Sequence, residues 1–216
     1  MAQTTMVTNW LPQVTLKISL LLLTIFTLSS CSAVDSKNTR YYPVKQYSPR
    51  ENSLGFSISP PPGDHWYEKL KDNSLIYLKK YQPENYAIYT QATEIHLDSP
   101  ISAEKELVAY VMESKNIDTA SERYKNLKSR YHTAKSPSRQ CVSYENNFED
   151  HGVKNLKNDS FVIVKSSGLF CLHPDTPNVG IDIYYFEKSI SGTNTRSYQN
   201  EGEQFIASLN FNTIRL

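Results

Sequence analysis

The chain has 216 residues, with 23 Lys and Arg against 22 Asp and Glu, which gives a formal net charge of +1. A chain of this length is sufficient for one domain of ordinary size. The balanced charge excludes the strongly basic surface that nucleic-acid binding requires, so we expect no nucleic-acid partner.

An apolar run, Ile18–Leu28, precedes two serines and Cys31. About 20 apolar residues are needed to span the hydrocarbon core of a membrane, so this run is too short for a comfortable transmembrane helix. With Lys17 before it and small residues after it, the run fits a secretory signal peptide. We therefore expect residues 1–30 to be a signal peptide, with a short anchor helix as the alternative.

The four residues Leu28-Ser29-Ser30-Cys31 resemble the lipobox of bacterial lipoproteins. The resemblance implies cleavage before Cys31, lipidation of its thiol, and a chain anchored in the cell envelope through its lipid. Two or more acyl chains give such stable anchoring. In enterobacterial lipoproteins, Asp directly after the lipidated cysteine implies retention in the inner membrane. This chain has Ser32 there, and the resemblance therefore implies an outer-membrane protein that faces the periplasm. An ordinary signal peptide with an incidental cysteine is the competing interpretation.

The segment after Cys31 is polar and has no sustained apolar period. It predicts a flexible tether over residues 31–52, with a root-mean-square reach of about 25 Å. Its tyrosines could instead pack on the domain or rest at the lipid interface. The remaining residues, 53–216, are expected to form a single domain.

Strand patterns dominate the start of that domain. Leu54, Phe56 and Ile58 alternate before a turn signal at residues 60–63, and Trp66 opens a short segment. An apolar run follows at residues 75–78, and residues 85–97 are rich in Tyr, Ile and Thr. These segments predict a β-hairpin or meander.

The apolar period then becomes helical and predicts a helix over residues 103–115, with Ser102 as its cap. Residues 123–135 fit a helix and a strand equally well. Alternation predicts strands over 140–148 and 179–185, and the apolar start of 160–172 predicts another. Apolar residues between Tyr198 and Leu209 predict a final helix. This order predicts an α+β domain, an antiparallel sheet packed by about two helices.

Two cysteines, Cys141 and Cys171, remain once Cys31 is assigned to the lipid. Disulfides persist in exported proteins, so an even pair predicts one bridge that staples two strands. Such a loop would add roughly 3–4 kcal/mol to the free energy of unfolding. The alternative is a metal site with His173, but zinc sites usually have two close ligand pairs. We expect the disulfide, and neither a metal nor a cofactor.

The segments "GFSISPPPGDHW", "CVSYE", "GLFCLHPD" and "EGEQFIASLNF" loosely resemble parts of exported lipoproteins of unknown function. The order of elements is also similar to the PsbP/Mog1-like α+β sandwich. That fold implies a role in binding or assembly and carries no active site that could be transferred to this chain.

Local patterns do not indicate catalysis. The sequence has no nucleophile elbow, glycine-rich phosphate loop or H-E-x-x-H motif. The groups Glu149-Asp150-His151 and His173-Pro174-Asp175 could hold a cation or act as acid and base, but an exposed loop and a strand-end turn explain them better. A site that assembles only in space would not show in the sequence.

Residues 123–139 carry Lys and Arg with no acid and with interleaved tyrosines. In an envelope protein, Arg123, Lys125, Lys128 and Arg130 could contact anionic lipids, glycan phosphates or an acidic partner. A solvated face with the tyrosines on its buried side is the alternative. We therefore expect a non-enzymatic envelope lipoprotein that binds or scaffolds. A small periplasmic hydrolase or metal-dependent enzyme is the alternative.

Overall fold

The computed structural model describes residues 40–51, 55–71, 73–80, 87–117, 122–136, 139–156, 160–193 and 196–211. The chain divides into two compact units, and the boundary lies between Thr39 and Arg40. The predicted signal peptide and Cys31 lie outside the described residues. All that follows concerns the second unit.

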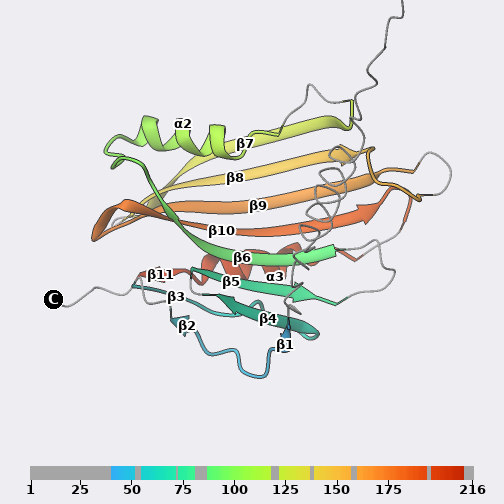
Figure 1. Cartoon of the computed structure of the whole chain (residues 1–216), viewed down its shortest axis with the longest axis horizontal. Helices are drawn as coiled ribbons and strands as arrows, with labels where there is room; N and C mark the ends of the chain where they lie inside the picture. Colours follow the sequence, from blue (N-terminus) through green and yellow to red (C-terminus); the bar gives the residue numbers. More distant parts are fainter. Residues whose placement is uncertain are drawn as a thin grey trace, which may run out of the picture. The chain divides into compact units, whose positions relative to one another are not determined.

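An eight-stranded antiparallel sheet forms the centre of this unit, in the order β1-β4-β5-β6-β10-β9-β8-β7 (Figure 1). The strands are β1 (Tyr42–Pro43), β4 (Trp66–Lys71), β5 (Ser74–Lys79), β6 (Ala87–His96), β10 (Thr176–Ile190), β9 (Val162–His173), β8 (Arg139–Asp150) and β7 (Tyr124–Ser136). A smaller sheet has the order β11-β3-β2, from Asn210–Phe211, Phe56–Ile58 and Arg50–Glu51.

Helix α2 (Glu104–Ser114) packs on β7 and β8. Leu107 and Val111, one turn apart, are its buried residues, and each contributes about 1.5–3 kcal/mol by burial. The predicted helix is confirmed, but the prediction that Ser102 caps it is wrong. Ala103 is the N-cap, and the Glu106 carboxylate accepts the backbone N–H groups of Ser102 (3.4 Å) and Ala103 (3.3 Å).

Helix α3 (Gln199–Ala207) packs against β10 and β9. Phe205 is fully buried, and Gly202 lets the helix approach the sheet closely. A Cβ atom at Gly202 would lie 2.3 Å from the ring of Tyr185, so the close packing depends on glycine here. The predicted last helix is therefore confirmed.

The two helices cover opposite faces of the large sheet. On β10, Ile181, Ile183 and Tyr185 belong to the core under α3, whereas Tyr184 lies with the core under α2. Successive side chains of a strand point to opposite faces, so one strand supplies both cores. The predicted α+β fold with an antiparallel sheet and two helices is confirmed.

Residues 123–135, whose pattern fits a helix and a strand equally, form most of β7. This strand pairs with β8 from Tyr124 to Ser136, with one irregularity between Lys125 and Lys128. A residue in the irregularity, Asn126, has φ of 54°. Tertiary pairing decides the conformation here because the local pattern does not.

The compact unit begins earlier than the sequence predicts. β1 pairs with β4, β2 pairs with β3, and the Tyr47 hydroxyl donates to the Gly63 carbonyl oxygen at 2.6 Å. The Arg50 guanidinium binds Glu68 at 3.1 Å. Residues 40–51 of the expected tether are therefore held on the domain by these short strands and contacts, as in the alternative that its tyrosines pack there; residues 31–39 and 52 lie outside the described residues.

The predicted disulfide is present between Cys141 and Cys171. The two residues are direct partners in the ladder of β8 and β9, with their Cα atoms 4.1 Å apart. Because both thiols are committed to this bridge, the alternative metal site that used them with His173 is excluded.

Candidate functional site

The middle of β9 carries only small side chains on both faces of the sheet. The run Ser166-Ser167-Gly168 lies between larger apolar residues such as Val164 and Phe170. In the sheet, this part of β9 pairs with β10 on one side and with β8 on the other. Since side chains alternate, Ser167 leaves space on the α3 face and Ser166 leaves space on the α2 face. A hollow lies on each face at this point.

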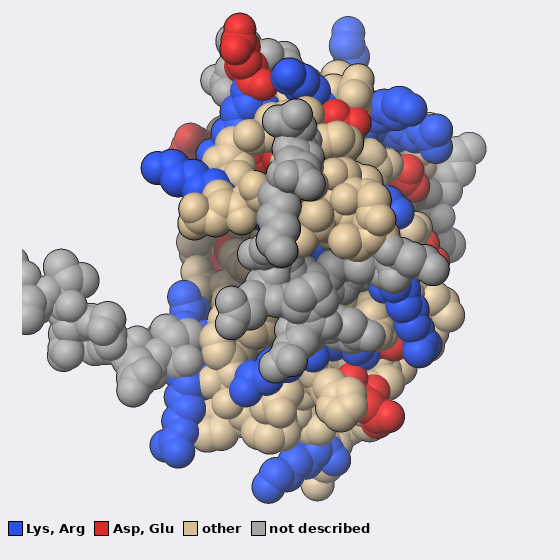
Figure 2. All heavy atoms as spheres, turned by 90° about the vertical axis from the view of Figure 1, so that its right-hand side faces the viewer, with Lys and Arg blue, Asp and Glu red and all other residues tan. Residues whose placement is uncertain are grey.

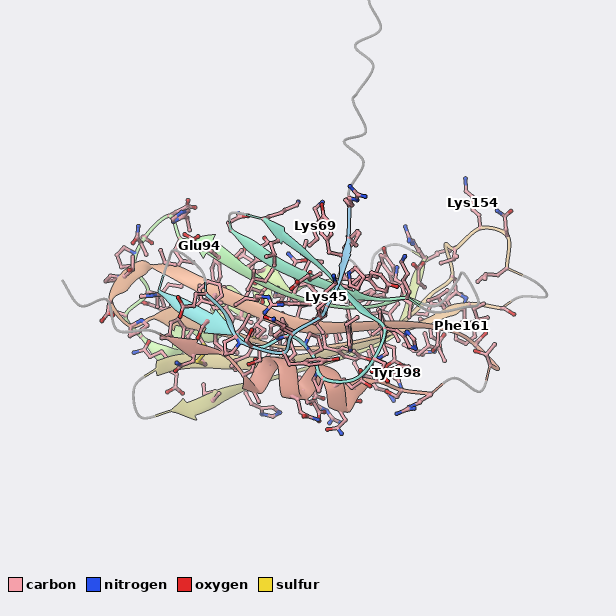
Figure 3. The ribbon with its side chains drawn as sticks, turned by 90° about the horizontal axis from the view of Figure 1, so that it is seen from below. Lys45, Lys69, Glu94, Lys154, Phe161 and Tyr198 are labelled. Atoms are coloured by element: carbon pink, nitrogen blue, oxygen red, sulfur yellow. A yellow bond between two sulfur atoms is a disulfide. The ribbon has the colours of Figure 1, made fainter. Side chains whose placement is uncertain are left out.

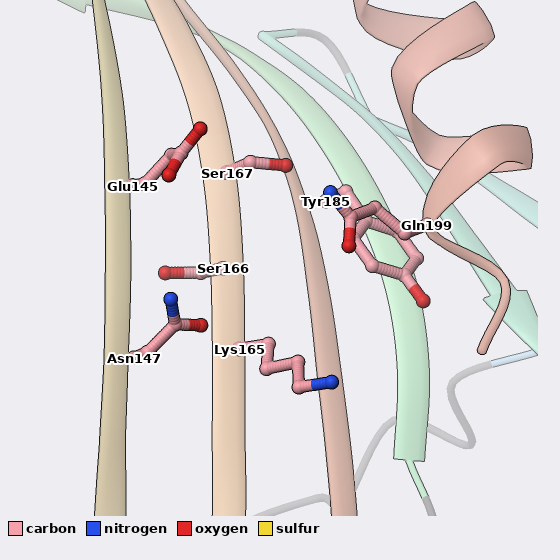
Figure 4. Close-up of a pocket in the computed structure, with 7 residues that line it drawn as sticks. All are labelled: Glu145, Asn147, Lys165, Ser166, Ser167, Tyr185 and Gln199. Carbon is pink, nitrogen blue, oxygen red and sulfur yellow. The ribbon is translucent and has the colours of Figure 1, made fainter. Parts of the chain in front are cut away.

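The hollow on the α3 face, termed the α3-side pocket, has a volume of about 230 Å³. Figure 4 shows that its side chains come from three strands and the start of α3: Glu145, Asn147, Lys165, Ser167, Tyr185 and Gln199. Ser166 points away from the side on which Ser167 and Lys165 lie (Figure 4). The pocket is polar and contains both signs of charge.

A buried carboxylate holds one wall of this pocket. Glu187 is 4% exposed and accepts hydrogen bonds from the Tyr185 hydroxyl, from Ser197 Oγ (3.0 Å) and from the backbone N–H of Tyr198 (3.4 Å). Negative charge is favourable at the start of a helix. Glu187 therefore links β10 to the beginning of α3 and orients the Tyr185 ring.

Ser167 is the candidate nucleophile of the pocket. Its Oγ is buried and has no hydrogen-bond partner among the described residues. Activation of a serine requires a general base within hydrogen-bond reach. The arrangement of the described side chains therefore suits hydrogen bonding to a ligand better than nucleophilic attack.

The hollow on the α2 face, termed the α2-side groove, has a volume of about 250 Å³. Its lining includes Gln91, Lys115, Tyr144, Asn146, Asp182 and Tyr184. In the register of the sheet, Gly168 stands between Tyr144 and Tyr184. The Tyr144 ring lies over this glycine, since a Cβ there would be 2.3 Å from the ring carbon Cζ.

A charged pair closes one end of the groove. Lys115 Nζ, at the end of α2, lies 2.5 Å from Asp182 Oδ2, and the Tyr144 hydroxyl donates to Asp182 Oδ1 at 2.7 Å. Lys115 also lies over the rings of Tyr144 (4.9 Å) and Tyr184 (5.5 Å). Burial, and then the charge of Asp182, raises the pKa of Tyr144 well above its usual value, so the hydroxyl stays a donor.

Aromatic rings line the same face. Tyr89 packs edge-on against Tyr184 (5.9 Å between centroids) and obliquely against Phe186 (4.7 Å). The Tyr184 hydroxyl donates to Gln91 Oε1 at 3.1 Å, and Gln91 Nε2 donates to Thr93 at 2.5 Å. Burial raises the pKa of Tyr184, which keeps this donor protonated as well.

Neither hollow is predicted by the sequence. The available signal is the run of small residues Ser166-Ser167-Gly168 between the apolar segments 162–164 and 169–172 of one strand. Such a run does not show which side chains surround it, because the neighbours come from β6, β8 and β10.

The two histidine groups do not assemble into one site. His151 Nε2 lies 3.0 Å from Glu149, and its ring stacks on Phe161. His173 is buried at the end of β9, where its Nδ1 accepts the backbone N–H of Asp175 at 3.1 Å. Figure 3 shows Phe161, on which His151 stacks, and Glu94 at opposite ends of the sheet. The strand register places His173 at the same end of the sheet as Glu94, so the two histidines lie far apart. Within the described ranges, no group of three or more His, Cys, Asp or Glu is placed to hold a metal.

Three of the predicted basic residues lie on β7 and Arg123 directly precedes it, and β8 supplies carboxylates that the local sequence lacks. Arg123 donates to both oxygens of Asp150 (2.7 and 2.8 Å), Lys125 pairs in register with Glu149, and Arg130 lies 3.8 Å from Glu145. Lys128 pairs with Asn147. Figure 2 shows Lys and Arg scattered among acidic and uncharged side chains at one end of the molecule. The acids offset much of the positive charge of the segment.

No helix within the described part of the chain has the length and apolar character that crossing a membrane requires. The sequence matches no protein-family profile, and no curated protein sequence is significantly similar to it. Among solved structures, the human StarD13 (DLC2) lipid transfer and protein localization domain is similar over 65% of this chain and 81% of that domain, with 10% identity and a TM-score of 0.24. A likeness this distant carries no information on function.

Proposed function

We propose that this protein is a lipid-anchored lipoprotein of the bacterial cell envelope whose domain binds a ligand or partner and does not catalyse a reaction. The proposal includes the outer membrane as its location, with the domain facing the periplasm, and a PsbP/Mog1-like arrangement of the α+β fold.

The observation that carries this proposal is the bridge between Cys141 and Cys171. It commits two of the three cysteines and leaves Cys31, the residue at the lipobox-like sequence. Disulfides persist in oxidising compartments such as the periplasm and are rare in the cytosol. Export and lipidation of Cys31 therefore explain all three cysteines together.

The position of Arg40 limits how far the domain can extend from such an anchor. Residues 32–39 separate Cys31 from the compact unit. Eight residues span at most about 30 Å in any conformation. A lipidated chain would therefore keep its domain near the membrane surface, which suits binding to another envelope component.

Lipidation is tested with the Cys31→Ser variant in a Gram-negative host fed a palmitate analogue. Wild type should take up the label and fractionate with the outer membrane, and Cys31→Ser should lose the label. A matched control, Cys141→Ala with Cys171→Ala, removes the other two thiols and should keep the label. Label that persists in Cys31→Ser, or that disappears only in the control, would contradict the proposal.

Location is tested with Ser32→Asp. By the sorting rule that the lipobox resemblance implies, this variant should move from the outer to the inner membrane fraction. An inner-membrane location of wild type itself would contradict that part of the proposal.

Binding is tested by photo-crosslinking in intact cells. A photoreactive residue at Gln199, in the α3-side pocket, should give a specific adduct, while the same residue at Leu70, which is 54% exposed on β4, should not. Equal patterns from both positions would contradict a binding role for the pocket. Hydrolase activity lost in Ser167→Ala would instead support the enzymatic alternative.

The chemistry of the partner is tested by charge reversal on β7. Lys125, Lys128 and Arg130 are exposed. Changing all three to Glu should weaken binding to anionic vesicles at low salt if they contact an anionic surface. Unchanged binding would exclude this surface from the proposal.

A further inference from the structure

Asn146 is a buried polar group that the fold does not satisfy. It lines the α2-side groove, is 4% exposed, and its Oδ1 has no hydrogen-bond partner in the described part of the chain. An acceptor left in this state is costly, and natural proteins rarely retain one without a reason. Oδ1 has almost no accessible surface, so a ligand's O–H or N–H donor would supply the missing bond when the amide turns toward the groove.

The surroundings of Asn146 combine hydrogen-bonding groups with flat apolar surface. In the register of the sheet, Asn146, Ser166 and Phe186 form one row across three strands, and Tyr144, Gly168 and Tyr184 form the next. The small central residue Ser166 leaves room between Asn146 on β8 and Phe186 on β10, whereas the Tyr144 ring covers Gly168 in the next row.

The charge of the groove is balanced. Lys115 and Asp182 pair with each other at 2.5 Å, and the Tyr144 hydroxyl also binds this carboxylate. A charged ligand would therefore meet no unpaired opposite charge here. An acyl chain or a flat aromatic ligand could cover the rings but would leave Asn146 unsatisfied.

We propose that the α2-side groove binds one neutral saccharide unit, with its hydroxyl groups on Asn146 and its ring face against Tyr184 and Phe186. A sugar ring carries donors around its rim and C–H groups on its faces, which matches the two sides of the groove. The volume of about 250 Å³ lies below the roughly 300–1,000 Å³ of pockets for drug-sized ligands, so it suits a single ring. This inference deepens the proposed binding role but does not depend on the lipid anchor.

The test is saturation-transfer NMR on the full chain, purified in a zwitterionic detergent without a sugar headgroup. The probes are glucose and N-acetylglucosamine. Cyclohexanol supplies the ring without the full set of hydroxyls, and glucuronate adds a negative charge. At least one neutral sugar should receive saturation and show a measurable Kd, and cyclohexanol and glucuronate should bind more weakly.

Variants assign the binding to the groove. Asn146→Leu should weaken the Kd of the sugar at least tenfold, and its urea unfolding curve checks that it folds. Tyr184→Ala should also weaken binding, while Tyr184→Phe, which keeps the ring, should retain most of it. Asn178→Ala is the matched control, because Asn178 is an exposed asparagine outside the groove.

Three results would overturn the inference. The first is the absence of saturation transfer to both neutral sugars. The second is binding of cyclohexanol or glucuronate that equals or exceeds that of the neutral sugars. The third is a folded Asn146→Leu chain that binds the sugar as tightly as wild type. Each leaves the palmitate-labelling result untouched, so failure of this inference is distinguishable from failure of the proposed lipoprotein function.

Discussion

Gly168→Ala is the sharpest test of the packing that creates the α2-side groove. An added Cβ would lie 2.3 Å from Cζ and 2.4 Å from Oη of Tyr144, and 2.8 Å from the carbonyl oxygen of Ile183. Contacts below 3.0 Å cannot persist, so the Tyr144 ring must move. The ring is 3% exposed, and its hydroxyl donates to Asp182.

Two effects set the magnitude. Overpacking a core site costs about 1–3 kcal/mol. Displacement of the ring also removes a buried hydrogen bond to a carboxylate, which costs about 1–3 kcal/mol. We therefore expect Gly168→Ala to lower the free energy of unfolding by about 2–6 kcal/mol, a large part of the 5–15 kcal/mol typical of a folded protein.

The assay is urea unfolding followed by intrinsic fluorescence, with the slope of the transition checked against wild type. Ser166→Ala, two residues away on the same face, should change the free energy of unfolding by less than about 1 kcal/mol. Adding Tyr144→Ala to Gly168→Ala should cost less than the sum of the single variants, because the clash is gone. A Gly168→Ala chain within 1 kcal/mol of wild type, or strict additivity in the double variant, would refute the placement of the ring.

Three further predictions concern other parts of the domain. Lys79→Met should lower the free energy of unfolding by about 3 kcal/mol, because it removes the cation 2.6 Å from the Glu201 carboxylate, and adding Glu201→Gln should recover most of the loss in urea titrations. The Arg123 guanidinium lowers the pKa of Asp150, so this pair stabilises the fold fully above about pH 4 and loses its effect as the pH falls through the lowered pKa. Asp150→Asn should therefore flatten the acid side of the stability–pH curve, and an unchanged curve would contradict the pairing. Reduction of the disulfide should lower the free energy of unfolding by roughly 2–4 kcal/mol, which unfolding curves with and without reductant would measure.

Much of the fold could be predicted because its signals are local. The alternation in 85–97 and 179–185 predicts β6 and β10, and the helical spacing of Leu107 and Val111 predicts α2. The even pair of cysteines predicts the bridge, and the structure adds that the two residues are direct partners in a ladder. In each case the residues whose spacing predicts the element are the same residues that form its buried face or its bridge.

Other features could not be predicted because their causes lie elsewhere in the chain. Residues 124–136 are a strand because β8 pairs with them, and the short strands before residue 53 exist because β4 and β3 supply their partners. The basic segment has no acid in its own sequence, yet Asp150 binds Arg123 across the ladder. The pairing strands and the Asp150 carboxylate lie outside the segments that they order, so the local sequence does not show them.

The sequence by itself determines the α+β class, the cysteine pairing and the lipobox-like run at Cys31, since these depend on local periods and counts. The tertiary structure decides where a ligand could bind. Ser166 and Ser167 each lie in a hollow only because β8 and β10 place Asn146 and Tyr184 around the first and Tyr185 beside the second. The physical reason is that a strand alternates its side chains between two faces, whereas the pairing of distant strands decides which residues share each face.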